Sequence, residues 1–150
     1  MKKKLTILLI LGTSILYNMQ AQCVDAKEIA KKCKSNLKPF NYDGFADNPF
    51  TFKDKAQTVS VEFTAYAGQK YKLIFTSNGF KEEVKVNIYD KTKTNPKRQK
   101  IYDSSNGIDN LFWSFEPSKT GTYYIEYDIP TALEGDLGKT GCMILLIGYK

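Results

Sequence analysis

The sequence ends in Gly141-Cys-Met-Ile-Leu-Leu-Ile-Gly-Tyr-Lys150, and every side chain from Cys142 to Ile147 is apolar. Neighbouring residues of a strand point to opposite faces of a sheet, so a strand here would have two apolar faces, and both would need cover. The stretch therefore predicts a central strand. We expect one of its faces to meet other strands and the other face to meet a helix.

That helix is predicted close to the N-terminus, over residues 24–37, and Pro39 ends it. Acidic residues stand in its first turn and lysines follow, which is the order that the helix dipole favours. Its apolar residues fall within one narrow arc of the helix: Ala26, Ile29, Ala30, Cys33 and Leu37. Because this stripe is narrow and made of small residues, the helix is expected to lie close to a flat sheet face.

Alternation of apolar and polar residues predicts further strands through the middle of the chain. The first two are expected to form a hairpin around Ala67-Gly68-Gln69. The pattern, with no alternation of strands and helices, predicts a mainly β protein: a single antiparallel β-sandwich with about seven to eight strands and one N-terminal helix packed on a sheet. The strands expected before the final one are residues 58–65, 71–76, 84–89, 101–103, 111–115 and 122–129.

Residues 39–57 lack this alternation and contain the turn signals Asp43-Gly44 and Asn48-Pro49. They predict a crossing segment with a short edge strand at Phe50–Lys53. Its aromatic residues are expected to cover one end of the core, and an aromatic platform for sugar rings is the alternative.

The first 21 residues have the three parts of a secretory signal. Lys2, Lys3 and Lys4 precede an apolar segment, and Ala21 offers a small residue for cleavage before Gln22. The apolar segment has roughly a dozen residues, short of the ~18 that a membrane span needs. We therefore expect an exported domain of residues 22–150 without a membrane span. A lipid on Cys23 is the alternative, disfavoured because glutamine precedes that cysteine.

Three cysteines remain after cleavage, Cys23, Cys33 and Cys142, and an exported protein can keep a disulfide. On one helix Cys23 and Cys33 would be roughly 15 Å apart, about twice the separation that a disulfide spans. A bridge is therefore expected to reach Cys142. Cys33 is favoured as its partner because it belongs to the inward stripe, and Cys23 remains the alternative.

The composition excludes many kinds of chemistry. The sequence contains no histidine, which excludes Ser-His-Asp and Cys-His nucleophiles and histidine zinc sites. Without the three signal lysines, the net charge of +6 becomes +3, too weak for a dedicated nucleic-acid binder. Glycoside hydrolysis by a carboxylate pair remains open. We expect a protein that is not an enzyme.

Two groups of residues are candidates for ligand binding. Tyrosines at outward strand or turn positions could stack on sugar rings, and a basic loop over residues 90–100 could hold an acidic ligand. A solvated loop tip is the alternative for that loop. The candidates are Tyr66, Tyr89, Tyr124, Lys97 and Arg98.

Asp43, Asp47 and Asp54 carry oxygen ligands of the kind that calcium prefers, although their spacing is not that of an EF-hand loop. Aspartates also cap turns for purely local reasons, which is the alternative. Calcium is the one cofactor that the sequence suggests.

Residues 61–75, 86–90 and 115–125 resemble the pre-peptidase C-terminal type of domain, a jelly-roll-like sandwich of secreted bacterial proteins. Nearly the whole mature chain is also similar to a group of short secreted Gram-negative proteins. These begin with a cysteine-bearing helix and end in Gly-Cys, an apolar run and Ile-Gly-Tyr-Lys. The resemblances imply an accessory or binding module in the periplasm or on the surface of a Gram-negative bacterium, and they supply no catalytic residues.

Together these features predict an exported, non-catalytic binding module for an extracytoplasmic ligand, either a carbohydrate or a cell-surface protein. No nucleic acid is expected among its partners. The alternative is a structural or assembly subunit that makes protein contacts through open sheet edges.

Overall fold

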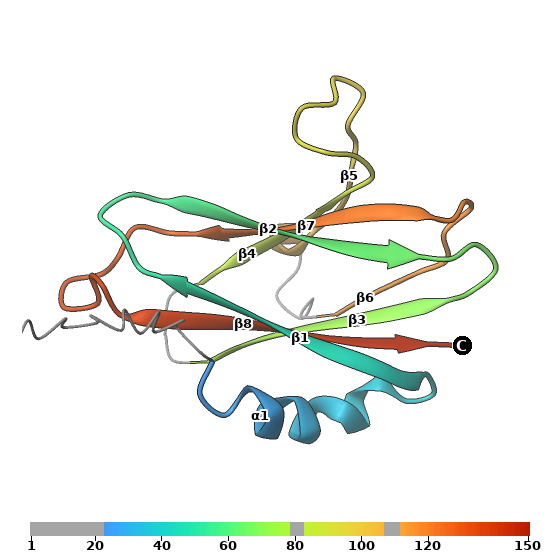
Figure 1. Ribbon diagram of the computed structural model, residues 1–150, viewed down its shortest axis with the longest axis horizontal. Coiled ribbons are helices and arrows are strands. Elements are labelled where there is room, and N and C mark those ends of the chain that lie inside the picture. Colours follow the sequence, from blue (N-terminus) through green and yellow to red (C-terminus); the bar gives the residue numbers. More distant parts are fainter. Residues whose placement is uncertain (1–22, 79–82, 107–111) are drawn as a thin grey trace, which may run out of the picture.

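The computed structural model describes residues 23–78, 83–106 and 112–150 (Figure 1). The predicted signal peptide and Leu111 lie outside these residues. The described residues form one α-helix, two short 3-10 helices and eight strands. In chain order they are α1 (Ala26–Cys33), η1 (Lys34–Leu37), β1 (Asn41–Thr51), β2 (Gln57–Ala65), β3 (Tyr71–Asn78), β4 (Lys85–Tyr89), β5 (Lys100–Asp103), η2 (Ser104–Asn106), β6 (Phe112–Phe115), β7 (Gly121–Ile129) and β8 (Thr140–Tyr149).

The strands form two four-stranded antiparallel sheets. Sheet A has the order β1-β8-β3-β6, and sheet B has the order β2-β7-β4-β5. This is the strand order of a jelly roll, in which all consecutive strands except β4 and β5 lie in different sheets. Figure 1 shows the sheets as stacked layers with α1 on the outer side of sheet A. The predicted mainly β sandwich with one helix is confirmed.

Strand β8 is central, between β1 and β3, as its apolar sequence predicts. Met143 and Leu145 point into the core between the sheets. Cys142, Ile144 and Leu146 point the other way, into a second apolar cluster beneath the helix. Both faces of the strand are buried, because each meets a different layer.

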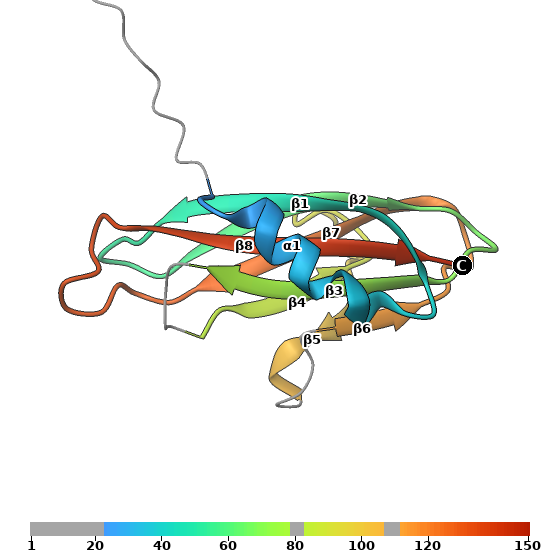
Figure 2. The ribbon, with the colours of Figure 1, turned by 90° about the horizontal axis from the view of Figure 1, so that it is seen from below.

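The helix lies over β8, across the outer face of sheet A (Figure 2). Ala26, Ala30 and Leu37 are buried against Ile74 and the outer face of β8, while Ile29 and Cys33 are partly buried there. The regular helix ends at Cys33 and a 3-10 turn continues to Leu37, so the predicted stripe spans both.

Residues 39–57 differ from the expected crossing segment, because most of them form the long edge strand β1. An edge strand tolerates proline and a bulge, since only one of its sides must pair. Pro49 lies opposite Cys142, and the register shifts between Tyr42 and Gly44, which leaves Asp43 in a bulge. The residues Asp43-Gly44 and Asn48-Pro49 therefore lie within an irregular edge strand and not in turns.

The expected hairpin between β2 and β3 is also wrong, because these strands lie in different sheets. The turn around Gly68, which has a positive φ of 82°, carries the chain from sheet B to sheet A. Alternation showed correctly which residues face the core, but it holds no information about which strands pair.

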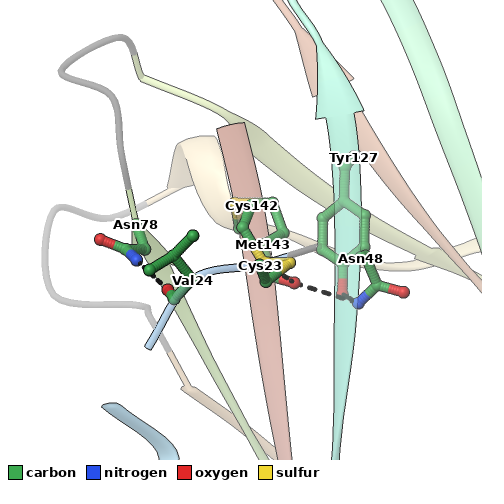
Figure 3. The surroundings of a disulfide bond; sticks show 7 residues. All are labelled: Cys23, Val24, Asn48, Asn78, Tyr127, Cys142 and Met143. Carbon is green, nitrogen blue, oxygen red and sulfur yellow. Dashed lines mark hydrogen bonds between the residues drawn. A yellow bond between two sulfur atoms is a disulfide. The ribbon is translucent and has the colours of Figure 1, made fainter. Parts of the chain in front are cut away.

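The disulfide joins Cys23 to Cys142, with the two Cα atoms 5.6 Å apart (Figure 3). The favoured pairing with Cys33 is therefore wrong, and Cys33 is a free, partly buried thiol. The segment before α1 is also held by Asn78, whose amide donates a hydrogen bond of 2.6 Å to the carbonyl of Val24. Asn78 is the partner of Cys142 in the β3–β8 pair, so the two attachments lie side by side.

Candidate functional site

The structure brings two of the predicted site residues, Tyr66 and Asp43, into one pocket. The sequence suggested them for different reasons, Tyr66 for sugar stacking and Asp43 for calcium. The pocket has a volume of about 240 Å³. We call it the Asp43–Tyr66 pocket, and its lining consists of Asp43, Thr64, Tyr66, Gln69, Tyr71 and Tyr149.

Three irregular features of the chain build the pocket. The bulge in β1 puts Asp43 out of the regular alternation, and bulges commonly re-aim a side chain in this way. The turn after β2 presents Tyr66, whose side chain is 56% exposed. Tyr149 comes from the end of β8, where it lies between Asn41 of β1 and Tyr71 of β3.

Hydrogen bonds hold the floor of the pocket in place. The Tyr71 hydroxyl donates to Oε1 of Gln69 at 2.7 Å and accepts from the backbone N–H of Tyr66 at 3.1 Å. The Tyr71 ring itself is buried, in edge contact with Phe63 at 5.2 Å between centroids. Since Tyr71 is fixed on both sides, the turn that carries Tyr66 and Gln69 has a defined shape.

The lining offers the groups that recognise polyhydroxylated ligands. The Asp43 carboxylate accepts hydrogen bonds, the Gln69 amide nitrogen donates them, and the Thr64 hydroxyl does both. Within the described part of the chain, no ion pair or hydrogen bond occupies the Asp43 carboxylate. The exposed ring of Tyr66 and the partly buried ring of Tyr149 add an apolar surface beside these polar groups.

Tyr89 and Arg98 also come together, but they engage each other. The guanidinium carbon of Arg98 lies 3.3 Å from the centre of the Tyr89 ring. Nη2 of Arg98 contacts Oε1 of Glu126 at 2.6 Å, and these two side chains are only 15% and 9% exposed. The loop between β4 and β5 therefore folds back on the outer face of sheet B, and Tyr89 is not an open platform there.

The remaining basic loop is held by local contacts. The Gln99 backbone N–H, bonded to Asp90 at 2.7 Å, is the main cause that lowers the pKa of Asp90. The Lys100 ammonium, together with Ser105, holds the pKa of Asp103 well below its usual value, and the same ion pair raises the pKa of Lys100. Lys97 is exposed, and its backbone N–H donates to Oδ1 of Asn95 at 2.9 Å.

Tyr124 lies on the outer face of sheet B, opposite Glu62 and Tyr89, and is partly buried. The other two predicted calcium ligands are remote from the pocket lining, since Asp47 lies four residues along β1 and Asp54 follows the strand. Across residues 23–78, 83–106 and 112–150, no three acidic, cysteine or histidine side chains form a group that could hold a metal ion.

A larger hollow of about 370 Å³ lies at the opposite end of β2, beside Thr58, Lys85 and Asp128. Two carboxylates line it, Glu83 and Asp128, and Asp128 already accepts hydrogen bonds from Thr58 at 2.8 Å and Asn87 at 2.7 Å. Because Asp128 is already engaged by Thr58 and Asn87, we take the Asp43–Tyr66 pocket as the better candidate despite its smaller volume.

No protein-family model matches the chain, and no curated protein matches it. Two solved structures with distant similarity are described as PliG, a periplasmic lysozyme inhibitor of g-type lysozyme. The one from Aeromonas hydrophila has a TM-score of 0.47 and 16% identity, over 75% of this chain and 90% of that one. The one from Salmonella Typhimurium has a TM-score of 0.39 and 16% identity, over 73% and 90%.

A mutant of the Escherichia coli inhibitor gives a TM-score of 0.37 and 12% identity, over 73% of this chain and 90% of that one. With TM-scores below 0.5, these likenesses say nothing about what this chain binds. The resemblance to pre-peptidase C-terminal domains stays a prediction. No helix within the described ranges has the length and apolar character required to cross a membrane.

Proposed function

We propose that this chain is an exported, non-catalytic binding module that recognises carbohydrate through the Asp43–Tyr66 pocket. The observation that carries the proposal is the meeting of a carboxylate, an amide and a hydroxyl with the exposed ring of Tyr66 and the partly buried ring of Tyr149. Sugars present hydroxyl groups on their edges and apolar C–H groups on their faces, and this combination matches both. The volume of the pocket is smaller than the roughly 300–1,000 Å³ of sites for drug-sized ligands, so the pocket suits a single sugar ring at the end of an oligosaccharide.

A binding role is favoured over hydrolysis by the number of carboxylates. Glycoside hydrolysis uses two carboxyl groups, about 5 to 9.5 Å apart. The Asp43–Tyr66 pocket is lined by a single one, Asp43. With no histidine anywhere in the sequence, the pocket also lacks the commonest general base.

The disulfide supports a location outside the cytoplasm. Such bonds persist in the periplasm and at the cell surface, whereas the cytosol keeps thiols reduced. The Cys23–Cys142 bond begins directly after the predicted signal, so the bond and the predicted export agree. We place the module in the periplasm or at the surface of a Gram-negative cell, where peptidoglycan and surface polysaccharides are within reach.

The test uses residues 22–150 with the disulfide intact, on an array of peptidoglycan fragments and bacterial surface oligosaccharides. The best glycan is then titrated against Asp43→Asn and Tyr66→Ala. Removing the charge of Asp43 should weaken binding about tenfold or more, since hydrogen bonds to charged groups contribute about 1.5 to 3 kcal/mol. Tyr66→Ala should weaken it as well, through the lost ring contact.

Asp54→Asn is the matched control, because it removes the same charge from an exposed aspartate that does not line the pocket. It should bind like the parent. If no glycan binds, or if both pocket variants bind as tightly as the parent protein, the proposal is wrong. Capture of a protein ligand without any glycan would point instead to the other partner class that the sequence suggests.

A further inference from the structure

Strand β2 is the one long, unprotected sheet edge in the described part of the chain. The sheets end at β1, β6, β2 and β5. Strands β5 and β6 have only four residues each, and β1 carries Pro49 and the Asp43 bulge. Short strands, proline and bulges are the devices that stop an edge from pairing with another chain. Strand β2 has nine residues with none of these devices.

The pairing of β2 with β7 is regular over its whole length, from Gln57 to Ala65, with no shift of register. Alternate N–H and C=O groups of such a strand point away from its neighbour, and on β2 they point to the free side. Val59 and Val61 face the core but are only partly buried. A further strand on this side would pair the backbone groups and cover both valines.

The sequence of β2 is complementary to itself around Val61. In an antiparallel pair centred there, Ser60 of each copy lies opposite Glu62 of the other. The pair therefore allows two symmetric hydrogen bonds, each from a serine hydroxyl to a glutamate carboxylate. On the core side Val59 lies opposite Phe63, a β-branched and aromatic pair of the kind that stabilises sheets. A pair centred on Glu62 would place the two Glu62 carboxylates opposite each other, which disfavours that register.

We infer that a second copy of this chain occupies the free edge of β2. The two copies pair antiparallel about a two-fold axis at Val61, which joins both B sheets into one continuous sheet. The arrangement is isologous, so it closes after two copies and does not continue into a fibre.

The dimer would also shape the binding site, on the condition that the proposed carbohydrate role is correct. The last pair joins Ala65 to Gln57 of the other copy, and Tyr66 lies just beyond it. The two Ala65 residues are eight positions apart along the paired strands, roughly 27 Å. Two pockets on one rigid sheet would bind a repeating polysaccharide bivalently, with higher avidity than either alone.

The dimer is tested without any glycan, by sedimentation equilibrium of residues 22–150 from roughly 1 to 500 µM. We expect concentration-dependent dimers. Val61→Lys should raise the dimer dissociation constant at least about 100-fold, because two ammonium groups would be buried opposite each other. In the single copy the partly exposed position lets a lysine reach water, so the fold is kept. Val61→Thr, also β-branched, is the control and should still dimerise.

Ser60→Lys tests the register from the opposite direction. It places a lysine opposite Glu62 in both halves of the pair and should tighten the dimer about tenfold at low salt. Ser60 is exposed, and in the isolated copy it lies opposite Glu126 of β7, so the stability of the variant at low concentration is measured as the baseline. A protein that stays monomeric throughout, or a dimer that neither lysine variant changes, would overturn the inference.

Discussion

Gly148 lies directly beneath Leu37: a methyl group added at Gly148 would come 2.9 Å from Cδ2 of Leu37. The same methyl would be 3.1 Å from Cβ of Phe40 and 3.2 Å from the carbonyl oxygen of Asn41. The end of the helical segment and the start of β1 therefore close over the backbone of β8 at a residue without a side chain. This relationship gives the glycine of the C-terminal Ile-Gly-Tyr-Lys sequence a structural role.

Gly148→Ala should destabilise the protein by about 1 to 3 kcal/mol, because overpacking forces the buried Leu37 and the backbone of Asn41 to move. Gly121→Ala, at the start of β7, is the control, since a methyl there would meet no atom within 4 Å. It should be neutral or slightly stabilising. Urea unfolding of both variants measures the difference, and equal midpoints would show that the contact at Gly148 is not tight.

The disulfide should stabilise the fold mainly through its long loop. Cys23 and Cys142 are 119 residues apart, and a bridge over such a loop contributes about 5 kcal/mol in the chain-entropy model. Cys142→Ser should lose much of this free energy, and Cys33→Ser should lose little, since that thiol is free. Unfolding curves measure both losses. Peptide mapping of the unreduced protein gives an independent check, and a bridge that contains Cys33 would contradict the structure.

The sequence was sufficient to predict the layers but not the path of the chain through them. The two apolar faces of β8 required cover on both sides, and the sandwich with its helix follows from that. The spacing of apolar residues in a helix shows which of its faces is buried, but not where each helical turn lies along the strand beneath it. Cys33 faces inward as expected, yet the helix begins beside Cys142, so Cys23 is the cysteine within reach.

The sequence does not predict strand β1, because residues that are typical of turns make buried contacts in it. Asn48 looks like a turn residue, but it is buried and donates to the carbonyl of Met143 at 3.2 Å and to the Tyr127 hydroxyl at 3.4 Å (Figure 3). It links the two sheets through the core. An asparagine with such partners cannot be distinguished from a turn asparagine by sequence alone.

The candidate site was partly within reach of the sequence. The sequence predicts both Asp43 and Tyr66 as candidates, because an aspartate in a turn-rich segment and a tyrosine at a turn are common features of ligand sites. Their meeting depends on the strand order, which puts β1 and the end of β2 at the same side of the sandwich. Gln69 and Tyr149 carried no signal of their own, apart from the place of Tyr149 in the C-terminal sequence.

Tyr127 should make the protein sensitive to alkaline pH. Burial raises the pKa of its phenol above the ordinary value of 10.0. The neutral phenol therefore contributes stability that is fully present below pH 10, and this stability is lost as the pH rises further and the unfolded chain ionises. Above that pH the ionisation of this one tyrosine in the unfolded chain should lower the free energy of unfolding by about 1.4 kcal/mol per pH unit.

Tyr127→Phe should remove this part of the pH dependence of the free energy of unfolding. Urea unfolding of both proteins between about pH 8 and pH 11 gives the two slopes, and the other tyrosines and the lysines contribute equally to each. Equal slopes would mean that the phenol reaches water in the folded state. Because the variant also takes one partner from Asn48, its stability at neutral pH must be measured as the baseline.

The ion pair between Arg98 and Glu126 should contribute more to stability than a surface pair. Both side chains are largely buried, and Arg98 also stacks on Tyr89 and donates through Nε to the carbonyl of Lys91 at 3.2 Å. Arg98→Ala leaves Glu126 buried without its partner. Breaking a buried pair in this way costs about 3 to 5 kcal/mol, and the residual exposure of Arg98 should reduce this to about 2 to 3.

Arg98→Lys should be intermediate, since it keeps the charge and loses the planar stack on Tyr89. The matched control is Lys70→Ala, which breaks the pair of Lys70 and Glu116 at 3.2 Å, with side chains that are 55% and 51% exposed. That change should cost less than about 1 kcal/mol. Urea unfolding of the three variants and the parent orders them. If Arg98→Ala costs no more than Lys70→Ala, the loop between β4 and β5 is not fixed on sheet B, and Tyr89 becomes available as the open ring that the sequence suggested.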